Sequence, residues 1–430
     1  MPTSTTSLAL ALLLLPADVA RAASWVMDDT CEEMAIYGLG VADASHAAVG
    51  ATSASGALPA FYNASNGCTF TANSPSGAIM DMAALPNNEA VVYATFAGQY
   101  LSTDQGASWN RVGDAVNPIQ SVTALNGDSF ALAGEFTTKE LGYFGGVILS
   151  TDKGSTWTSY PIDGAQYVRY GAYPSDSTWY VTEGSWPSTG ATDNANAAAE
   201  PSFFVHAFPD LASGGADLSA NIRIGKGAPK RKQINLGIAG VAGVAGVAGV
   251  AGGLRGSSSS GQAGTDYGYV ANIWKTSDGG KTFTKVFSSE PTDAFYFNSI
   301  SCGSETSCVA VADGKVPSNS KIITYQTFAY HTSDGGKTWS QVFDGGDAYM
   351  SLLAVKMVSE TEGWMGPSGL LPGSNTVAVT DFYQTTDGGA TWSLGQTLQD
   401  CVAAEIDSAD GLVMAACMGH FSDATVAVYK

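Results

Sequence analysis

The sequence predicts an all-β protein whose sheets form a closed ring, a seven-bladed β-propeller, with six or eight blades as the alternatives. Three observations lead to this fold class. A short motif recurs five times, strand-like segments flank its copies at a regular spacing, and the chain holds 51 glycines against 16 prolines, with 10% aromatic residues. Glycine-rich turns between short aromatic and β-branched segments are typical of all-β proteins. Internal repeats of about 40–50 residues indicate propellers and related repeat folds.

The recurring motif is an octapeptide whose copies align without gaps. They read STDQGASW at 102–109, STDKGSTW at 150–157, TSDGGKTF at 276–283, TSDGGKTW at 332–339 and TTDGGATW at 385–392. A sixth, degraded copy, NASNGCTF at 63–70, has serine at the aspartate position. Steps between neighbouring aspartates are 48, 56 and 53 residues for the pairs 104–152, 278–334 and 334–387, close to the length of one four-stranded blade.

Each copy is predicted to form the tip of the hairpin between the third and fourth strands of a blade. Its aspartate accepts hydrogen bonds from its own turn, its glycine supplies a positive φ angle, and its terminal aromatic ring packs between neighbouring sheets. We therefore predict a structural role, without a ligand, for the residues at these three positions: Asp104, Gly106, Trp109, Asp152, Gly154, Trp157, Asp278, Gly280, Phe283, Asp334, Gly336, Trp339, Asp387, Gly389 and Trp392.

The blade count follows from the strand signals around the motifs. Six blades end near residues 70, 112, 160, 287, 343 and 395. The long step from Asp152 to Asp278 is interpreted as one blade, the fourth, with a low-complexity Gly/Ala/Ser-rich insertion at 187–266. This insertion is expected to be disordered because it cannot bury enough apolar surface. Residues 400–430 hold three more strands, and residues 24–27 are expected to add the fourth strand and close blade seven.

Residues 1–23 are predicted to be a signal peptide, so the propeller is a single domain over 24–430 and the protein is secreted to the extracellular space. An apolar run at 8–15 precedes Ala20-Arg21-Ala22 and is too short to span a bilayer. Six cysteines follow, as expected of disulfides formed in an oxidising compartment. Their positions in the blades favour the local pairs Cys31–Cys68, Cys302–Cys308 and Cys401–Cys417, with Cys31 and Cys68 both assigned to blade one.

The charge and the scarcity of metal-binding residues exclude several functions. Nineteen basic residues against 39 acidic ones give a net charge of −20, and so acidic a surface repels phosphate backbones, so no nucleic acid is expected as a partner. No cysteine spacing is Cys-x-x-Cys and the chain has four histidines, which argues against a metal site. No cofactor and no membrane span are expected. Asn63-Ala64-Ser65 is an N-glycosylation sequon.

The octapeptide resembles the Asp-box, or BNR, repeat. Copies spelled with Asp-Gly-Gly, together with a strand containing Gly363-Trp364, resemble the single-propeller family that includes photosystem II assembly factors, within the wider sialidase-like and sortilin-like group, over roughly residues 76–395. The resemblance implies a propeller but no single function, because one fold serves many chemistries. A sialidase of this group would need three arginines for the substrate carboxylate, whereas only Arg111 and Arg169 lie in predicted blades.

Two functions are consistent with these observations. The favoured one is a monomeric, non-catalytic scaffold that binds a protein or a carbohydrate on the face opposite the Asp-boxes, where loops between second and third strands gather. The candidate ligand-face residues are Lys139, Glu140, Glu183, Trp186, Lys315 and His420. The alternative is a glycoside hydrolase, sialidase-like or polysaccharide-cleaving, with paired carboxylates in the central pocket. The sequence identifies no catalytic residue for this alternative.

Overall fold

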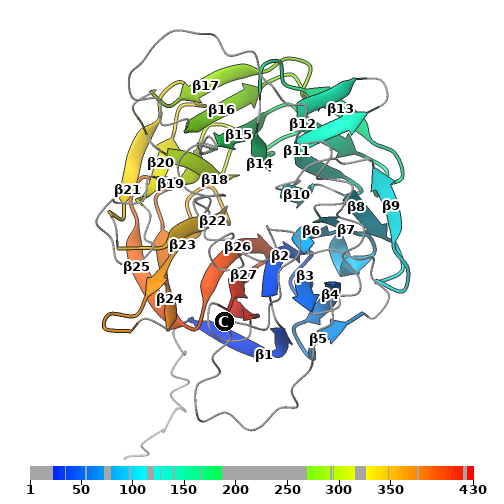
Figure 1. Ribbon diagram of the computed structural model, residues 1–430, viewed down its shortest axis with the longest axis vertical. Helices are drawn as coiled ribbons and strands as arrows, with labels where there is room; N and C mark the ends of the chain where they lie inside the picture. Colours follow the sequence, from blue (N-terminus) through cyan, green and yellow to red (C-terminus); the bar gives the residue numbers. More distant parts are fainter. Residues whose placement is uncertain are drawn as a thin grey trace, which may run out of the picture.

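Seven four-stranded antiparallel sheets form a ring around a central axis (Figure 1). The computed structural model describes residues 23–33, 35–53, 56–71, 79–95, 98–113, 121–125, 127–138, 141–165, 167–185, 269–290, 293, 295–314, 326–346, 348–374, 377–419 and 424–430. Within these ranges the helical structure is a single 3₁₀ turn, η1 (Pro86–Asn88). The predicted seven-bladed β-propeller is confirmed.

The first four blades follow one another along the chain. Blade one consists of β2 (Ala35–Val41), β3 (His46–Ser53), β4 (Gly56–Asn63) and β5 (Gly67–Phe70). Blade two consists of β6 (Ile79–Ala84), β7 (Val91–Thr95), β8 (Gly98–Ser102) and β9 (Asn110–Gly113). Blade three consists of β10 (Ser121–Ala124), β11 (Phe130–Thr138), β12 (Gly142–Ser150) and β13 (Thr158–Pro161). Blade four consists of β14 (Val168–Ala172), β15 (Trp179–Ser185), β16 (Val270–Thr276) and β17 (Thr284–Ser288).

The last three blades complete the circle. Blade five consists of β18 (Phe295–Cys302), β19 (Cys308–Gly314), β20 (Thr327–Thr332) and β21 (Ser340–Asp344). Blade six consists of β22 (Ser351–Met357), β23 (Gly363–Leu370), β24 (Ala378–Thr385) and β25 (Ser393–Gln399). Blade seven consists of β26 (Val402–Ala409), β27 (Leu412–Met418), β28 (Ala424–Tyr429) and the N-terminal strand β1 (Trp25–Glu33).

The strand order defines two faces of the ring. The first strand of each blade lies nearest the axis and the fourth lies on the outer edge (Figure 1). Because consecutive strands are antiparallel, the hairpins that carry the octapeptide motif and the turns between first and second strands lie on one face, which we call the Asp-box face after the motif that the octapeptide resembles. The connections between second and third strands, and those between consecutive blades, lie on the opposite face, which we call the top face.

The N-terminal strand closes the ring, as predicted. β1 pairs antiparallel with β28, with Trp25 opposite Tyr429, and Figure 1 shows this blue strand beside the red C-terminal strands. The Trp25 ring stacks on Phe382 of blade six with ring centroids 4.2 Å apart. The Gln396 amide accepts a hydrogen bond from the Trp25 N–H at 2.7 Å and donates one to the Trp25 carbonyl at 2.9 Å. Pairing of β1 with β28 therefore closes the ring through main-chain hydrogen bonds, and Trp25 adds apolar burial against blade six.

The three predicted disulfides are present, but one of them has a different location from the one expected. Cys302 pairs with Cys308 within blade five and Cys401 with Cys417 within blade seven. Cys31 pairs with Cys68, yet Cys31 lies on β1 and so belongs to blade seven, not to blade one. Because the N-terminal strand is the fourth strand of blade seven, this bond joins the outer strands of blades seven and one.

The hydrophobic core is a series of contacts between neighbouring sheets. One cluster joins Val309 and Val311 of blade five to Leu352 and Met365 of blade six, with Trp392 packed at its edge. Equivalent clusters fill the other blade interfaces. Each blade thus buries its apolar faces only when both neighbours are in place.

Blade four is a single blade, as predicted, because β15 and β16 pair directly and Ser185 lies opposite Val270. The insertion predicted at 187–266 connects these two strands and lies outside the described residues, as do residues 1–22 of the predicted signal peptide.

Candidate functional site

Charged side chains from innermost strands gather at the propeller axis. Asp81 lies on β6, Lys356 on β22, and Glu405 and Asp407 on β26. Lys356 Nζ donates a hydrogen bond to Asp407 Oδ1 at 2.5 Å, with the two side chains 27% and 21% exposed. Asp81, Glu405, Asp407 and Lys356 interact electrostatically although they come from blades two, six and seven. We call these four residues the axial cluster.

Two carboxylates of the axial cluster hold neighbouring blades together. Asp81 Oδ2 accepts a hydrogen bond from the Val122 N–H of blade three at 2.6 Å, and Oδ1 accepts one from the Met82 N–H at 2.7 Å. Asp407 Oδ2 accepts a hydrogen bond from the Val41 N–H of blade one at 2.7 Å. Each side chain thus joins its own blade to the main chain of the next one, so both residues stabilise the ring.

The same arrangement recurs between other blades. Asp313 of blade five, 1% exposed, accepts a hydrogen bond from the Leu352 N–H of blade six at 2.8 Å. Glu135 of blade three, 6% exposed, accepts one from the Tyr167 N–H, just before blade four, at 2.7 Å. Acidic side chains therefore connect blades two to three, three to four, five to six and seven to one; three of them are buried, and Asp407, between blades seven and one, is partly exposed.

Burial and crowding shift the pKa values of these groups. Desolvation, followed by repulsion from Asp407, raises the pKa of Asp81 to about 8. Burial, with repulsion from Asp81 and Asp407, holds the pKa of Glu405 well above its usual value. Burial lowers the pKa of Lys356, but attraction to Asp407, Glu405 and Asp81 outweighs this effect, so its pKa lies above the usual value. The axial cluster thus combines a cation with two carboxyl groups, Asp81 and Glu405, whose pKa values lie above the usual range.

Unlike Asp81 and Asp407, the Glu405 side chain accepts no hydrogen bond from the described residues of a neighbouring blade. It is partly exposed and accepts no hydrogen bond from any described residue. A protonated carboxyl group near an ionised one can act in general acid–base chemistry. No three His, Cys, Asp or Glu side chains within the described ranges are arranged to hold a metal ion.

The Asp-box aspartates direct their oxygens at their own turns. Asp334 accepts hydrogen bonds from the Thr338 N–H at 2.9 Å, the Thr338 hydroxyl at 2.7 Å and the Thr332 hydroxyl at 3.0 Å. The Gly336 N–H donates to the Thr332 hydroxyl, and Gly336 has φ +85°. The other four complete copies repeat this pattern at Asp104, Asp152, Asp278 and Asp387. The first hydroxyl of the motif, to which the sequence pattern assigned no role, donates to the aspartate and accepts from the glycine N–H.

Hydrogen bonds stabilise the ionised aspartates of these turns. Side-chain and main-chain donors at position 282 lower the pKa of Asp278 to about 2, and those of Thr338 and Thr391 do the same for Asp334 and Asp387. The terminal rings lie at blade interfaces, as Trp339 does beside Tyr180 of blade four, with centroids 6.4 Å apart.

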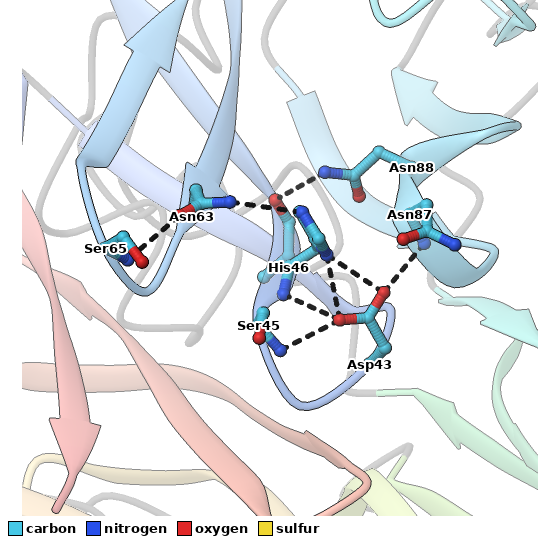
Figure 2. Close-up of polar contacts among 8 residues, drawn as sticks. Asp43, Ser45, His46, Asn63, Ser65, Asn87 and Asn88 are labelled. Atoms are coloured by element: carbon cyan, nitrogen blue, oxygen red, sulfur yellow. Dashed lines mark hydrogen bonds and ion pairs between the residues drawn. The ribbon is translucent and has the colours of Figure 1, made fainter.

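The degraded sixth copy does not form an Asp-box turn. Its strands pair directly, with Asn63 opposite Gly67. Figure 2 shows the polar network that surrounds this turn on the Asp-box face. Asp43 accepts hydrogen bonds from His46 Nδ1 at 2.9 Å and from the Asn87 N–H of blade two at 2.7 Å, while Asn63 Nδ2 lies 3.1 Å from His46 Nε2. In this copy, which lacks the aspartate, the Asn63 side chain accepts a hydrogen bond from the Ser65 N–H at 2.9 Å, and Asp43 connects blade one to blade two.

Glu183 is the predicted ligand-face residue that the structure describes, and it is not in a loop. It lies within β15, is 4% exposed, and accepts hydrogen bonds from Asn272 Nδ2 at 2.9 Å and Trp274 Nε1 at 2.8 Å. Its carboxylate is thus occupied within its own blade. The other five candidates, Lys139, Glu140, Trp186, Lys315 and His420, lie outside the described residues.

The two blade arginines do not form a common site. Arg111 lies on β9 at an outer edge, whereas Arg169 lies on the innermost strand β14 with its guanidinium carbon 5.2 Å from the Tyr296 ring centroid. The axial cluster was not predicted from the sequence. A weak signal was available, since aspartate, glutamate and lysine are unusual within the apolar first strand of a blade.

Known proteins resemble this chain in structure and not in sequence. No family model matches the chain, and no curated protein matches it. A solved structure of YCF48 bound to D1 peptide is 10% identical, covers 95% of this chain and 94% of its own, and has a TM-score of 0.51. An ulvan lyase of polysaccharide lyase family PL25 is 8% identical over 94% of this chain and 95% of its own, with a TM-score of 0.51. A PL25 ulvan lyase bound to -[GlcA(1-4)Rha3S]- is 10% identical over 92% and 94%, with a TM-score of 0.50.

At these identities the likeness shows the fold alone. The chain is a β-propeller similar in structure to YCF48 and to ulvan lyase, and the Asp-box resemblance remains a prediction from the motifs. No helix among the described residues has the length and apolar character needed to cross a membrane.

Proposed function

We propose that this protein is a secreted, monomeric and non-catalytic scaffold that binds a protein or a carbohydrate on its top face. One observation carries the proposal. The axial side chains of Asp81 and Asp407 accept hydrogen bonds from the main chain of the next blade, so these groups stabilise a rigid ring. A rigid scaffold that presents loops is a common basis for binding.

Two further observations support parts of this proposal. Three disulfides, one of them across the closing seam, are compatible with an oxidising, extracellular environment. Propellers of similar fold bind a peptide in one solved structure and an acidic disaccharide repeat in another, so the architecture accommodates both classes of ligand.

A second candidate function is a polysaccharide-cleaving enzyme, and Glu405 is the specific observation that favours it. Its carboxyl group lies beside Asp81 and Lys356 without a hydrogen bond from the described residues, and its raised pKa suits a general acid. For this function Glu405 would protonate the leaving group of a polysaccharide chain bound at the axis, and a second carboxylate would be needed within roughly 5–10 Å.

Turnover separates the two candidates. The full-length protein is incubated with sialosides and with plant and algal polysaccharides, and reducing-end release is measured for the wild type, Glu405→Gln and Asp410→Asn. Asp410 is an exposed residue of the same blade and serves as the matched control. We expect binding of a ligand without product release and no difference among the three proteins. Product release that disappears in Glu405→Gln and persists in Asp410→Asn would replace the scaffold by the enzyme.

A further inference from the structure

We propose that Tyr167 is a ligand-contacting residue of the top face and that it receives a cationic side chain, lysine or arginine, from a protein partner. The inference rests on the proposed function, because it specifies the partner chemistry of the same face.

Tyr167 is an aromatic residue in an unusually exposed position. It lies on the top face, in the connection from β13 to β14, and is 52% exposed. Three other large hydrophobic side chains are exposed among the described residues: Leu141 also lies on the top face, whereas Val26 and Leu394 lie on the outermost strands β1 and β25. The ring of Tyr167 therefore contributes little to the core.

The backbone of Tyr167 is held in a conformation that tyrosine does not favour. Its φ is +60°, in the left-handed region where a bulky residue is strained. Two hydrogen bonds fix this conformation. The Tyr167 N–H donates to Glu135 Oε1 at 2.7 Å, and the Tyr167 carbonyl accepts from the Gly184 N–H at 3.0 Å.

Neither hydrogen bond involves the tyrosine side chain. Glycine or asparagine would adopt the same backbone at lower cost. The fold thus requires the turn at this position but not the aromatic ring, and a strained residue that presents an exposed ring is typical of a binding position.

Charge selects the kind of ligand. The chain has a net charge of −20, and Asp163, in the same connection as Tyr167, is exposed. Arg169, on the adjoining strand β14, has its guanidinium over the Tyr296 ring and interacts with Asp313. An acidic surface attracts cationic partners and accelerates their encounter, and the face of an exposed tyrosine ring binds guanidinium and ammonium groups. An anionic glycan would meet repulsion at the same place.

Fluorescence anisotropy of a labelled hexa-arginine peptide tests the proposal at low salt and at about 0.15 M salt. The full-length protein is compared with Tyr167→Asn, which suits a positive φ angle, with Tyr167→Phe, and with Leu394→Asn. The last variant removes a side chain of equal exposure, 53%, from the outer edge of blade six. Thermal melts show that each variant is folded.

We expect Tyr167→Asn to weaken peptide binding about three- to tenfold, with Tyr167→Phe and Leu394→Asn within about twofold of the wild type. The proposal is overturned if the wild type does not bind the peptide, or if Tyr167→Asn binds it as tightly as Leu394→Asn does. It is also overturned if Tyr167→Asn loses binding of neutral oligosaccharides while peptide binding is unchanged. If the Tyr167 proposal fails but another ligand binds without turnover, the scaffold proposal still stands. Turnover that depends on Glu405 would contradict the scaffold proposal and leave the Tyr167 result unaffected.

Discussion

Replacing Asp313 by asparagine is expected to change how the stability of the protein depends on pH. Asp313 Oδ1 accepts the Leu352 N–H, and Oδ2 has no hydrogen-bond partner among the described residues. Burial, the largest cause, raises its pKa from 3.8 to about 7. Because the folded protein binds this proton more tightly than the unfolded chain, the stabilisation is fully present below about pH 4 and is lost as the pH rises through about 7.

The magnitude follows from the two pKa values. A difference of about three pKa units, at about 1.4 kcal/mol each, corresponds to about 4 kcal/mol of unfolding free energy. Asparagine keeps the acceptor for Leu352, removes the titration and conserves the volume. The variant should therefore match the wild type within about 1 kcal/mol at pH 4 and exceed it by up to about 4 kcal/mol at pH 8.

Urea unfolding followed by tryptophan fluorescence, at several pH values from 4 to 8 with the disulfides intact, measures this difference. Subtracting the two curves cancels the other buried carboxyl groups, which titrate in both proteins. Parallel curves, or a variant less stable than the wild type at pH 8, would refute the reasoning that a buried, half-satisfied carboxyl group controls this pH dependence.

Three other perturbations test the ring and its hairpins. The double variant Cys31→Ser and Cys68→Ser opens a loop whose ends are 37 residues apart and should lose about 4 kcal/mol of unfolding free energy. If its denaturant unfolding equals that of the wild type, the disulfide between blades seven and one does not constrain the chain. Gly389→Ala places a Cβ 2.3 Å from a methyl carbon of Val309 at φ +98° and should cost about 2 kcal/mol or more, whereas an unchanged melting temperature would contradict this geometry. Asp334→Asn should lower the melting temperature at neutral pH because the amide nitrogen cannot accept the turn's hydrogen bonds. Since the pKa of Asp334 is lowered to about 2, its stabilisation is present above about pH 4 and is lost as the pH falls through about 2, so the difference between the two proteins should vanish in strong acid.

Much of the architecture could be predicted from the sequence, because its determinants are local. The chemistry of the hairpin tips is contained in eight consecutive residues, as Asp334 and Gly336 illustrate, so the motif reports its own conformation wherever it occurs. The spacing of the motif copies indicated the blade length. The three strand signals after residue 400 left the last blade one strand short, and this predicted a fourth strand from the N-terminus. The degraded copy at 63–70 shows the limit, since sequence similarity without the aspartate did not preserve the turn.

The candidate site was decided by the tertiary structure. Asp81 and Glu405 are far apart in the sequence and meet only because the ring brings blades two and seven together around one axis. Irregular pairing next to both residues, between Ile79 and Asp81 and between Ala403 and Glu405, interrupts the alternation by which a sequence assigns side chains to faces. In the same way, the sequence could assign Glu183 to blade four but could not show that its side chain is buried inside that blade. A short motif determines how a hairpin turns, whereas which side chains face the axis or the next blade depends on the register and closure of seven sheets at once.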